Sequence, residues 1–204
     1  HSHEALELYQ NMLCEGITPD NVTHLSVIAA CSDPATLHLG IEIHIKCIEM
    51  RQRSVELQQK SVKMHSKHAL SDEVLQNAFV HMYAKCDSLI DAREIFRKLS
   101  VRDVVSWNVL ITGYVESGCD GNALQCFEDM QKVGIVPDVI TFVSILKCCT
   151  NVIDIVKGRE LHTYMIQTGL KFDLFLSNTL IDMYAKCGLL ADTHKIFDEL
   201  LDRD

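Results

Sequence analysis

Several features that would point to a metal site or a membrane segment are missing from this 204-residue sequence. It contains no Cys-x-x-Cys pair, a spacing with which many structural zinc sites begin, so we expect no metal and no cofactor. Apolar runs stay below the roughly 18 residues that a membrane-spanning helix needs, so no membrane partner is expected. The chain opens on His1 without a basic, serine-rich leader, which indicates a piece of a longer protein.

Basic residues are fewer than acidic ones in this sequence. The chain has 19 lysines and arginines against 28 acidic residues, a formal charge of −9, which disfavours nucleic acid without excluding it. Hydrophobic residues make up 48% of the chain, so it should fold. The nine cysteines form an odd set without a secretory signal, which favours a reducing intracellular compartment. Most of them lie among apolar residues and are expected to act as small core side chains.

Internal repeats are the dominant pattern of the sequence. The segment MYAKC at 82–86 returns at 183–187, an offset of 101 residues. The pair Pro-Asp at 19–20 returns at 137–138, an offset of 118 residues. Gly40 and His44 likewise return 118 residues later. The difference of 17 residues between the two offsets indicates one insertion inside an otherwise regular array.

The insertion occupies about residues 45–68 and is basic. Its charged residues give a balance of +4 in an acidic chain; they are Lys46, Arg51, Arg53, Lys60, Lys63 and Lys67 against Glu49 and Glu56. We expect it either to prolong the second helix of its unit or to form an extra turn. A phosphate-contacting role and a merely solvated face both fit this composition.

An aspartate closes each repeat unit. The units are a partial one at 1–20, followed by 21–72, 73–103, 104–138, 139–173 and 174–204. Apolar residues recur in each unit at helical spacing in two stripes separated by a turn, and strand patterns are absent. One such hairpin cannot bury its own apolar face. The expected fold is therefore all-α, a right-handed α-solenoid of tandem helix-turn-helix repeats.

The residues of the units resemble one family of helical repeats in particular. The run VVSWNVLITGY at 104–114, closing with GIVPD at 134–138, is similar to the pentatricopeptide-repeat consensus. The run NTLIDMYAKCG at 178–188 resembles the short repeats of the plant PLS subclass. Units 21–72 and 139–173 resemble its long repeats, so the order is partial P, L, S, P, L, S. The insertion departs from this pattern. Without His-x-Glu and Cys-x-x-Cys, which the family's deaminase module needs, the segment is not expected to be an enzyme.

A second stripe runs along the first helix of each unit, at unit positions 2, 5, 9 and 13. The spacing keeps these positions on one helix face, which stacked hairpins would line along a groove. The resemblance implies that position-2 residues sandwich the bases; these are Val74, Val105, Ile140 and Phe175. Lysines at position 13 of the short units suit phosphate contacts; these are Lys85 and Lys186.

The family's rule for base choice pairs the fifth residue of a unit with its last residue. The resemblance gives three such pairs: Asn77 with Asp103, Asn108 with Asp138, and Asn178 with Asp204. Asparagine with aspartate implies a pyrimidine, uracil preferred. The long units carry Leu25 and Val143 at the fifth position, which cannot hydrogen-bond a base edge, so they are expected to be spacers or weak readers.

Each of these residues also has a structural interpretation. An aspartate before a helix is a common N-cap, which alone explains the closing aspartates. The asparagines could instead make hydrogen bonds between helices, and the lysines could be solvated. The partial unit 1–20 should be a lone helix whose Leu6, Tyr9 and Leu13 are poorly covered.

The function implied by the resemblance is sequence-specific binding of single-stranded RNA in a mitochondrion or chloroplast. The segment would be the specificity part of a C-to-U editing or other RNA-processing factor. Its partners would then include editing-complex proteins, or a deaminase module supplied in trans or beyond the C-terminus. The alternative is a protein-binding scaffold of tetratricopeptide type, which the acidic charge would suit.

Overall fold

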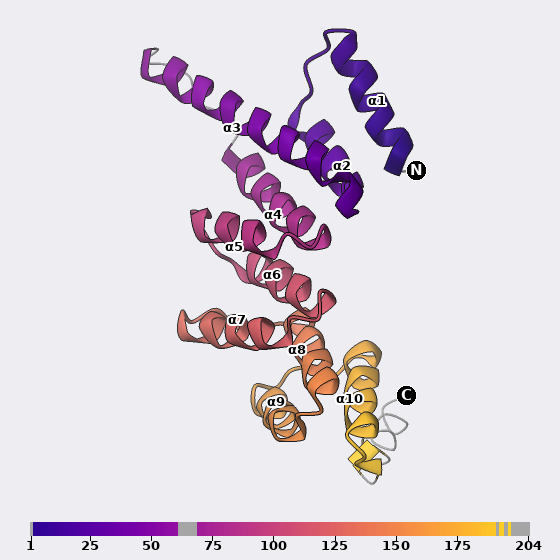
Figure 1. Cartoon of the computed structure of the whole chain (residues 1–204). Coiled ribbons are helices and arrows are strands. Elements are labelled where there is room, and N and C mark those ends of the chain that lie inside the picture. Colours follow the sequence, from indigo (N-terminus) through magenta and orange to yellow (C-terminus); the bar gives the residue numbers. More distant parts are fainter. Residues whose placement is uncertain (1, 61–68, 191, 194–195, 197–204) are drawn as a thin grey trace. The chain divides into compact units, whose positions relative to one another are not determined.

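The structure is a computed structural model that describes residues 2–60, 69–190, 192–193 and 196. Over these residues every regular element is a helix and none is a strand (Figure 1). The chain divides into two compact units, His1–Arg102 and Asp103–Asp204. Each unit has its own buried apolar core, so each is described separately.

The first unit is organised around α2. Its elements are α1 (Ser2–Cys14), α2 (Asn21–Ala30), the short 3₁₀ helix η1 (Pro34–Thr36), α3 (Leu37–Lys60), α4 (Ala69–Lys85) and α5 (Leu89–Lys98). Helix α2 packs against α1, α3 and α4, and α5 packs against α4. Ile28, Ile43 and Phe79, from three different helices, are almost wholly buried in this core.

The second unit is organised around α8, which is buried along most of its length. Its helices are α6 (Val104–Glu116), α7 (Asp120–Lys132), α8 (Val139–Val152), α9 (Ile155–Gln167) and α10 (Leu174–Lys186). Helix α8 packs against all four of the others (Figure 1). The core of this unit includes side chains that are almost wholly buried, among them Ile111, Phe127, Ile145 and Leu146. Within this unit the first helices α6, α8 and α10 are therefore neighbours in sequence order.

Aspartates that close repeat units start four of these helices. The carboxylates of Asp20, Asp103, Asp138 and Asp173 each accept a hydrogen bond from the backbone N–H three residues later, at 2.7, 2.9, 2.9 and 2.7 Å. Such a cap contributes about 1 kcal/mol to a helix. The capping role that the sequence offered for these residues is thus confirmed. Asp72 differs: it lies inside α4, whose described residues run from Ala69 to Lys85.

The insertion prolongs a helix. Helix α3 runs without a break for 24 residues to Lys60, and residues 61–68 of the insertion lie outside the described part. Helix α1 is the lone helix expected of the partial unit, and Leu6 and Leu13 are only half-buried. The expectation for Tyr9 was wrong. Its side chain is 3% exposed, because α1 packs on α2 and the Tyr9 ring meets His24.

Candidate nucleic-acid interface

Large apolar side chains are exposed at the second position of every repeat unit after the partial one. The four predicted stacking residues Val74, Val105, Ile140 and Phe175 are 54, 52, 58 and 60% exposed. Val22, at the same position of α2, is 69% exposed and was missed. The repeat pattern was the signal for it, because Val22 lies two residues after Asp20 as Ile140 lies two residues after Asp138. These side chains share one register position of the repeats, which makes them candidates for contact with a ligand.

The fifth and last positions of one unit are joined directly. The Nδ2 of Asn108 donates to Oδ1 of Asp138 at 2.9 Å, and the Oδ1 of Asn108 accepts from the hydroxyl of Thr141 at 2.6 Å. Asn108 is only 6% exposed. The hydrogen bond between helices that the structural interpretation offered is therefore present here. It uses one of the two N–H groups and one of the two oxygen lone pairs of the amide.

The other two pairs are only partly described. Asn77 lies in the first unit and Asp103 in the second, and Asp204 lies outside the described residues. The Oδ1 of Asn77 is buried, with no hydrogen-bond partner among the residues that the structure describes. Asn178 is exposed on α10. These two pairings stay predictions.

The thirteenth positions carry mixed charge. Lys85 and Lys186 are both exposed at the ends of their helices, and the amine of Lys186 lies 2.9 Å from a carboxylate oxygen of Asp182. Glu116 occupies the same position of α6. Asn151, at this position of α8, donates to Asp120 at 3.1 Å. Phosphates would therefore meet few cationic side chains along the predicted surface.

The spacer interpretation of the long units rests on the chemistry of their fifth residues. Val143 is 4% exposed in α8, and Leu25 is half-buried in α2. Burial does not distinguish Val143 from Asn108, which is 6% exposed at the same unit position, but neither Val143 nor Leu25 has a polar side-chain atom. Nothing in these two positions could read a base edge.

A packing motif that the sequence interpretation did not recognise occurs once in each unit. Nδ1 of His44 lies 3.2 Å from the hydroxyl of Tyr83, and Nδ1 of His162 lies 3.0 Å from that of Tyr184. Burial lowers the pKa of His44 and raises that of Tyr83 to about 12, so both are uncharged near neutral pH. The recurrence of Gly40 and His44 was the signal that could have revealed this motif.

The glycine of this motif allows close helix approach. A Cβ on Gly158 would lie 2.7 Å from Sδ and 2.8 Å from Cε of Met183, and one on Gly40 would likewise meet the sulfur of Met82. The motif fixes α10 against α9 in one unit and α4 against α3 in the other. It therefore positions the second-position and thirteenth-position residues of the short units.

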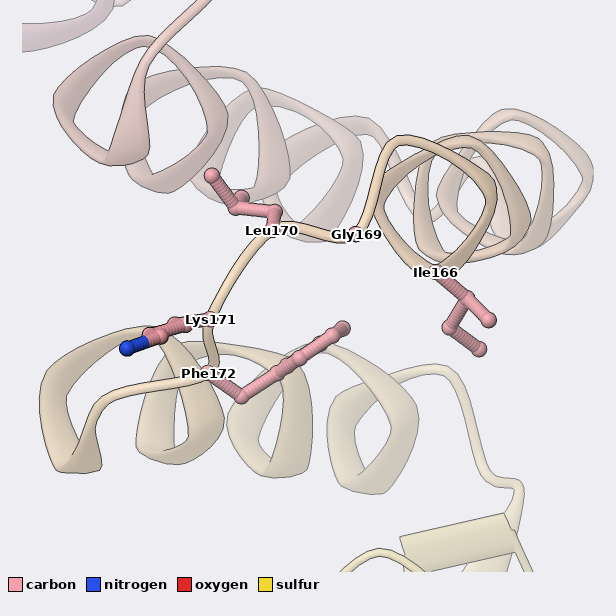
Figure 2. Close-up of a pocket in the computed structure, with 5 residues that line it drawn as sticks. All are labelled: Ile166, Gly169, Leu170, Lys171 and Phe172. Atoms are coloured by element: carbon pink, nitrogen blue, oxygen red, sulfur yellow. The ribbon is translucent and has the colours of Figure 1, made fainter.

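A shallow hollow of about 450 Å³ lies where the chain passes from α9 to α10. Figure 2 shows its lining, which consists of Ile166, Gly169, Leu170, Lys171 and Phe172. Lys171 is the sole titratable residue among them, so the hollow lacks the paired groups that acid–base chemistry needs. Over the described residues no three His, Cys, Asp or Glu side chains gather as metal ligands, and no helix could cross a membrane.

This arrangement defines a class of protein: tandem two-helix repeats that present one register of exposed side chains along their first helices. Residues 102–151 match the model of the PPR repeat family, and residues 175–204 match that of the PPR repeat. The chain therefore contains pentatricopeptide repeats.

Similar proteins carry the same name. A mitochondrial pentatricopeptide repeat-containing protein of Arabidopsis thaliana is 35% identical over 98% of this chain and 18% of its own length. A chloroplastic one from the same plant is 33% identical over 98% of this chain and 34% of its own length. The chain thus spans about a third or less of the length of these relatives. None of these matches distinguishes the PLS subclass.

Solved structures of maize PPR10 share the fold. One matches 95% of this chain and 26% of its own at a TM-score of 0.58 and 21% identity. PPR10 in complex with an 18-nucleotide psaJ RNA element matches 99% of this chain and 32% of its own, with a TM-score of 0.54 and 18% identity. The expectation of an all-α solenoid of tandem helix-turn-helix repeats is confirmed.

Proposed function

We propose that this chain binds single-stranded RNA and reads its bases one repeat at a time, without catalysing a reaction. The observation that carries the proposal is the regular exposure of second-position apolar side chains beside the hydrogen-bonded pair Asn108 and Asp138. Repeat proteins of this kind read about one base per repeat with two or three side chains. A solved relative, PPR10, has been seen with an RNA element bound.

The chemistry of the exposed groups suits unpaired bases. A base has two apolar faces and one hydrogen-bonding edge, and an edge is accessible only when the strand is single. Val105 and Ile140, both more than half exposed, provide surfaces for base faces on either side of Asn108 in the repeat order. The unused N–H and lone pair of the Asn108 amide match a base edge that offers one acceptor and one donor, as uracil does.

The other predicted residues extend this assignment. Asn77 with Asp103 and Asn178 with Asp204 would read two further bases, sandwiched by Val74 and Phe175 as the resemblance implies. Lys85 and Lys186 would contact phosphates. The proposed boundaries of the array are those of the units 1–20, 21–72, 73–103, 104–138, 139–173 and 174–204.

The finer role is that of the PLS subclass: specificity for C-to-U editing, or another RNA-processing step, in a mitochondrion or chloroplast. The organellar names of the relatives support the location. Editing would require a deaminase or editing-complex partner, since this chain contains neither His-x-Glu nor Cys-x-x-Cys.

A binding titration tests the proposal. We expect the chain to bind oligouridine more tightly than oligoadenosine, and duplex RNA least. Asn108→Thr should shift the preference of its unit from a pyrimidine toward a purine, as the family rule implies. Equal loss of affinity for every RNA would make Asn108 a structural residue. Absence of RNA binding, together with binding of peptides, would instead support the tetratricopeptide-type scaffold.

A further inference from the structure

The hydroxyl of Thr141 makes three contacts at the junction between two repeats. Thr141 is the third residue of α8 and is 0% exposed. Its hydroxyl lies 2.6 Å from Oδ1 of Asn108 and 3.0 Å from Oδ1 of Asp138, and it accepts a hydrogen bond from the backbone N–H of Asp138 at 3.1 Å. A side chain of the following repeat therefore touches both members of the base-reading pair.

These contacts fix which way the Asn108 amide faces. The Asp138 carboxylate can only accept, so the amide must turn its NH₂ group toward it. Thr141 has one hydroxyl hydrogen, and the amide oxygen of Asn108 is its nearer acceptor. Rotating the amide by 180° would place its oxygen against the carboxylate and its NH₂ against the hydroxyl. The first of these contacts is repulsive, and the second leaves the hydroxyl only the more distant Asp138 carboxylate as an acceptor.

The orientation of an amide decides which base it can read. Uracil presents a carbonyl acceptor next to a ring N–H donor, whereas cytosine presents an amino donor next to a ring acceptor. An amide that can turn over matches either order, because it carries one donor and one acceptor. An amide held in one orientation matches only one. Discrimination between two bases of equal size thus needs a residue that holds the amide.

The repeat register shows the same match of polarity elsewhere. Asn108 is followed by Thr141 at position 3 of the next unit, and Asn77 by Ser106. The long units, whose fifth residues are Leu25 and Val143, are followed by leucines at position 3. Those two leucines, Leu75 and Leu176, are 7 and 0% exposed. A hydroxyl side chain at position 3 thus follows a unit whose fifth residue is an asparagine, and a leucine at position 3 follows a unit whose fifth residue is apolar.

We propose that Thr141 is a positioning residue for base choice: it holds the Asn108 amide so that this repeat distinguishes uracil from cytosine. The specificity of one repeat then depends on the third residue of the next. This inference rests on the proposed RNA-binding function.

The test compares Thr141→Val with Thr141→Ser. The titration uses oligouridines in which each position in turn is replaced by cytidine, and the Asn108→Thr variant identifies the position that this repeat reads. Thr141→Val keeps the shape but removes the hydroxyl, so the uracil-to-cytosine ratio of affinities at that position should fall about two- to tenfold. Thr141→Ser should keep the ratio within about twofold.

Thr23→Val is the matched control. The Thr23 hydroxyl donates to the capping carboxylate of Asp20 at 2.6 Å, but the chain holds no fifth-position asparagine ahead of it. This variant should lose a similar amount of stability and leave every base ratio unchanged. A second readout needs no RNA: the side-chain amide resonances of Asn108 should shift in Thr141→Val and not in Thr23→Val.

The outcomes separate two failures. If the unaltered chain prefers uracil and Thr141→Val keeps the same ratio, Thr141 is merely a helix cap and this inference is wrong. If the unaltered chain binds none of the oligonucleotides, the proposed function is wrong, and the inference about Thr141 is then wrong as well.

Discussion

The ring of Tyr9 meets the ring of His24 edge-on, with centroids 6.2 Å apart and an interplanar angle of 63°. The same pair occurs 118 residues later as Phe127 and Phe142, at 6.3 Å and 65°. All four side chains are buried. In the first pair, however, the Tyr9 hydroxyl and Nδ1 of His24 are buried with no hydrogen-bond partner in the described part of the chain.

Replacing the first pair by the second should stabilise the chain. In Tyr9→Phe/His24→Phe two buried polar atoms are removed, and each such atom costs about 1–3 kcal/mol when it is unsatisfied. We expect the free energy of unfolding, measured in urea, to rise by about 1–3 kcal/mol for each of these two atoms. Phe127→Tyr is the reciprocal control and should destabilise. An unchanged or lower stability of the double variant would show that the polar atoms do have partners.

Acid should weaken the first unit. Burial lowers the pKa values of His24 and His44 below the unfolded value of about 6.5. As the pH falls, the unfolded chain therefore binds more protons than the folded chain. The contribution of these histidines to the free energy of unfolding is complete above about pH 6.5 and declines below it. Melting temperatures measured between pH 8 and 5 should show this decline, and His24→Phe should make it smaller. An equal decline in the variant would exclude His24 as a cause.

The contact between Gly158 and Met183 should not tolerate a methyl group. Gly158→Ala gains helix propensity of up to about 1 kcal/mol but presses its Cβ into the methionine, and such overpacking costs about 1–3 kcal/mol. We expect a net loss of stability in thermal unfolding. In the double variant with Met183→Ala, the loss should be smaller than the sum of the two single losses. Gly121→Ala, which meets no atom within 4 Å, is the control and should not destabilise.

Binding of RNA should depend only weakly on salt. Lysine occupies position 13 in just two of the uninterrupted units, so about two phosphate contacts predict a slope of log affinity against log salt near −1.4. Affinities measured between 50 and 200 mM salt, a range of about fourfold, would give the slope. A slope of about −4 or steeper would mean further cationic contacts, and the basic insertion would be the first suspect. Neutralising Arg51, Arg53 and Lys60 together should then flatten it.

Asp182 should oppose RNA binding. Its carboxylate lies 2.9 Å from the amine of Lys186, on the same face as the predicted base and phosphate contacts. Charges about 4 Å apart interact by about 1 kcal/mol in water, so Asp182→Asn should raise affinity about two- to fivefold at low salt. Glu94→Gln is the control. It removes the ion pair between Glu94 and Lys98 on α5, which is the second helix of its repeat, and it should leave the affinity for RNA unchanged. Equal effects of both substitutions would indicate a dependence on net charge alone.

The repeat pattern predicted much of the helical framework from local signals. The aspartates at 20, 103, 138 and 173 start helices because a carboxylate can satisfy a nearby backbone N–H whatever surrounds it. The exposure of the second positions also followed from register, since their helix face points away from the apolar stripe. The position of Asp72 inside α4 did not follow from the repeat pattern, which placed a unit boundary there.

By itself the sequence determined the class of fold and the aspartates that cap four helices, because both depend on spacing and chemistry along one segment. Only the tertiary structure decided which residues of different helices meet. Asn108 with Thr141, Gly158 with Met183 and Tyr9 with His24 are contacts between helices. Such contacts depend on the distance and rotation at which helices pack, and no periodicity within one helix encodes them.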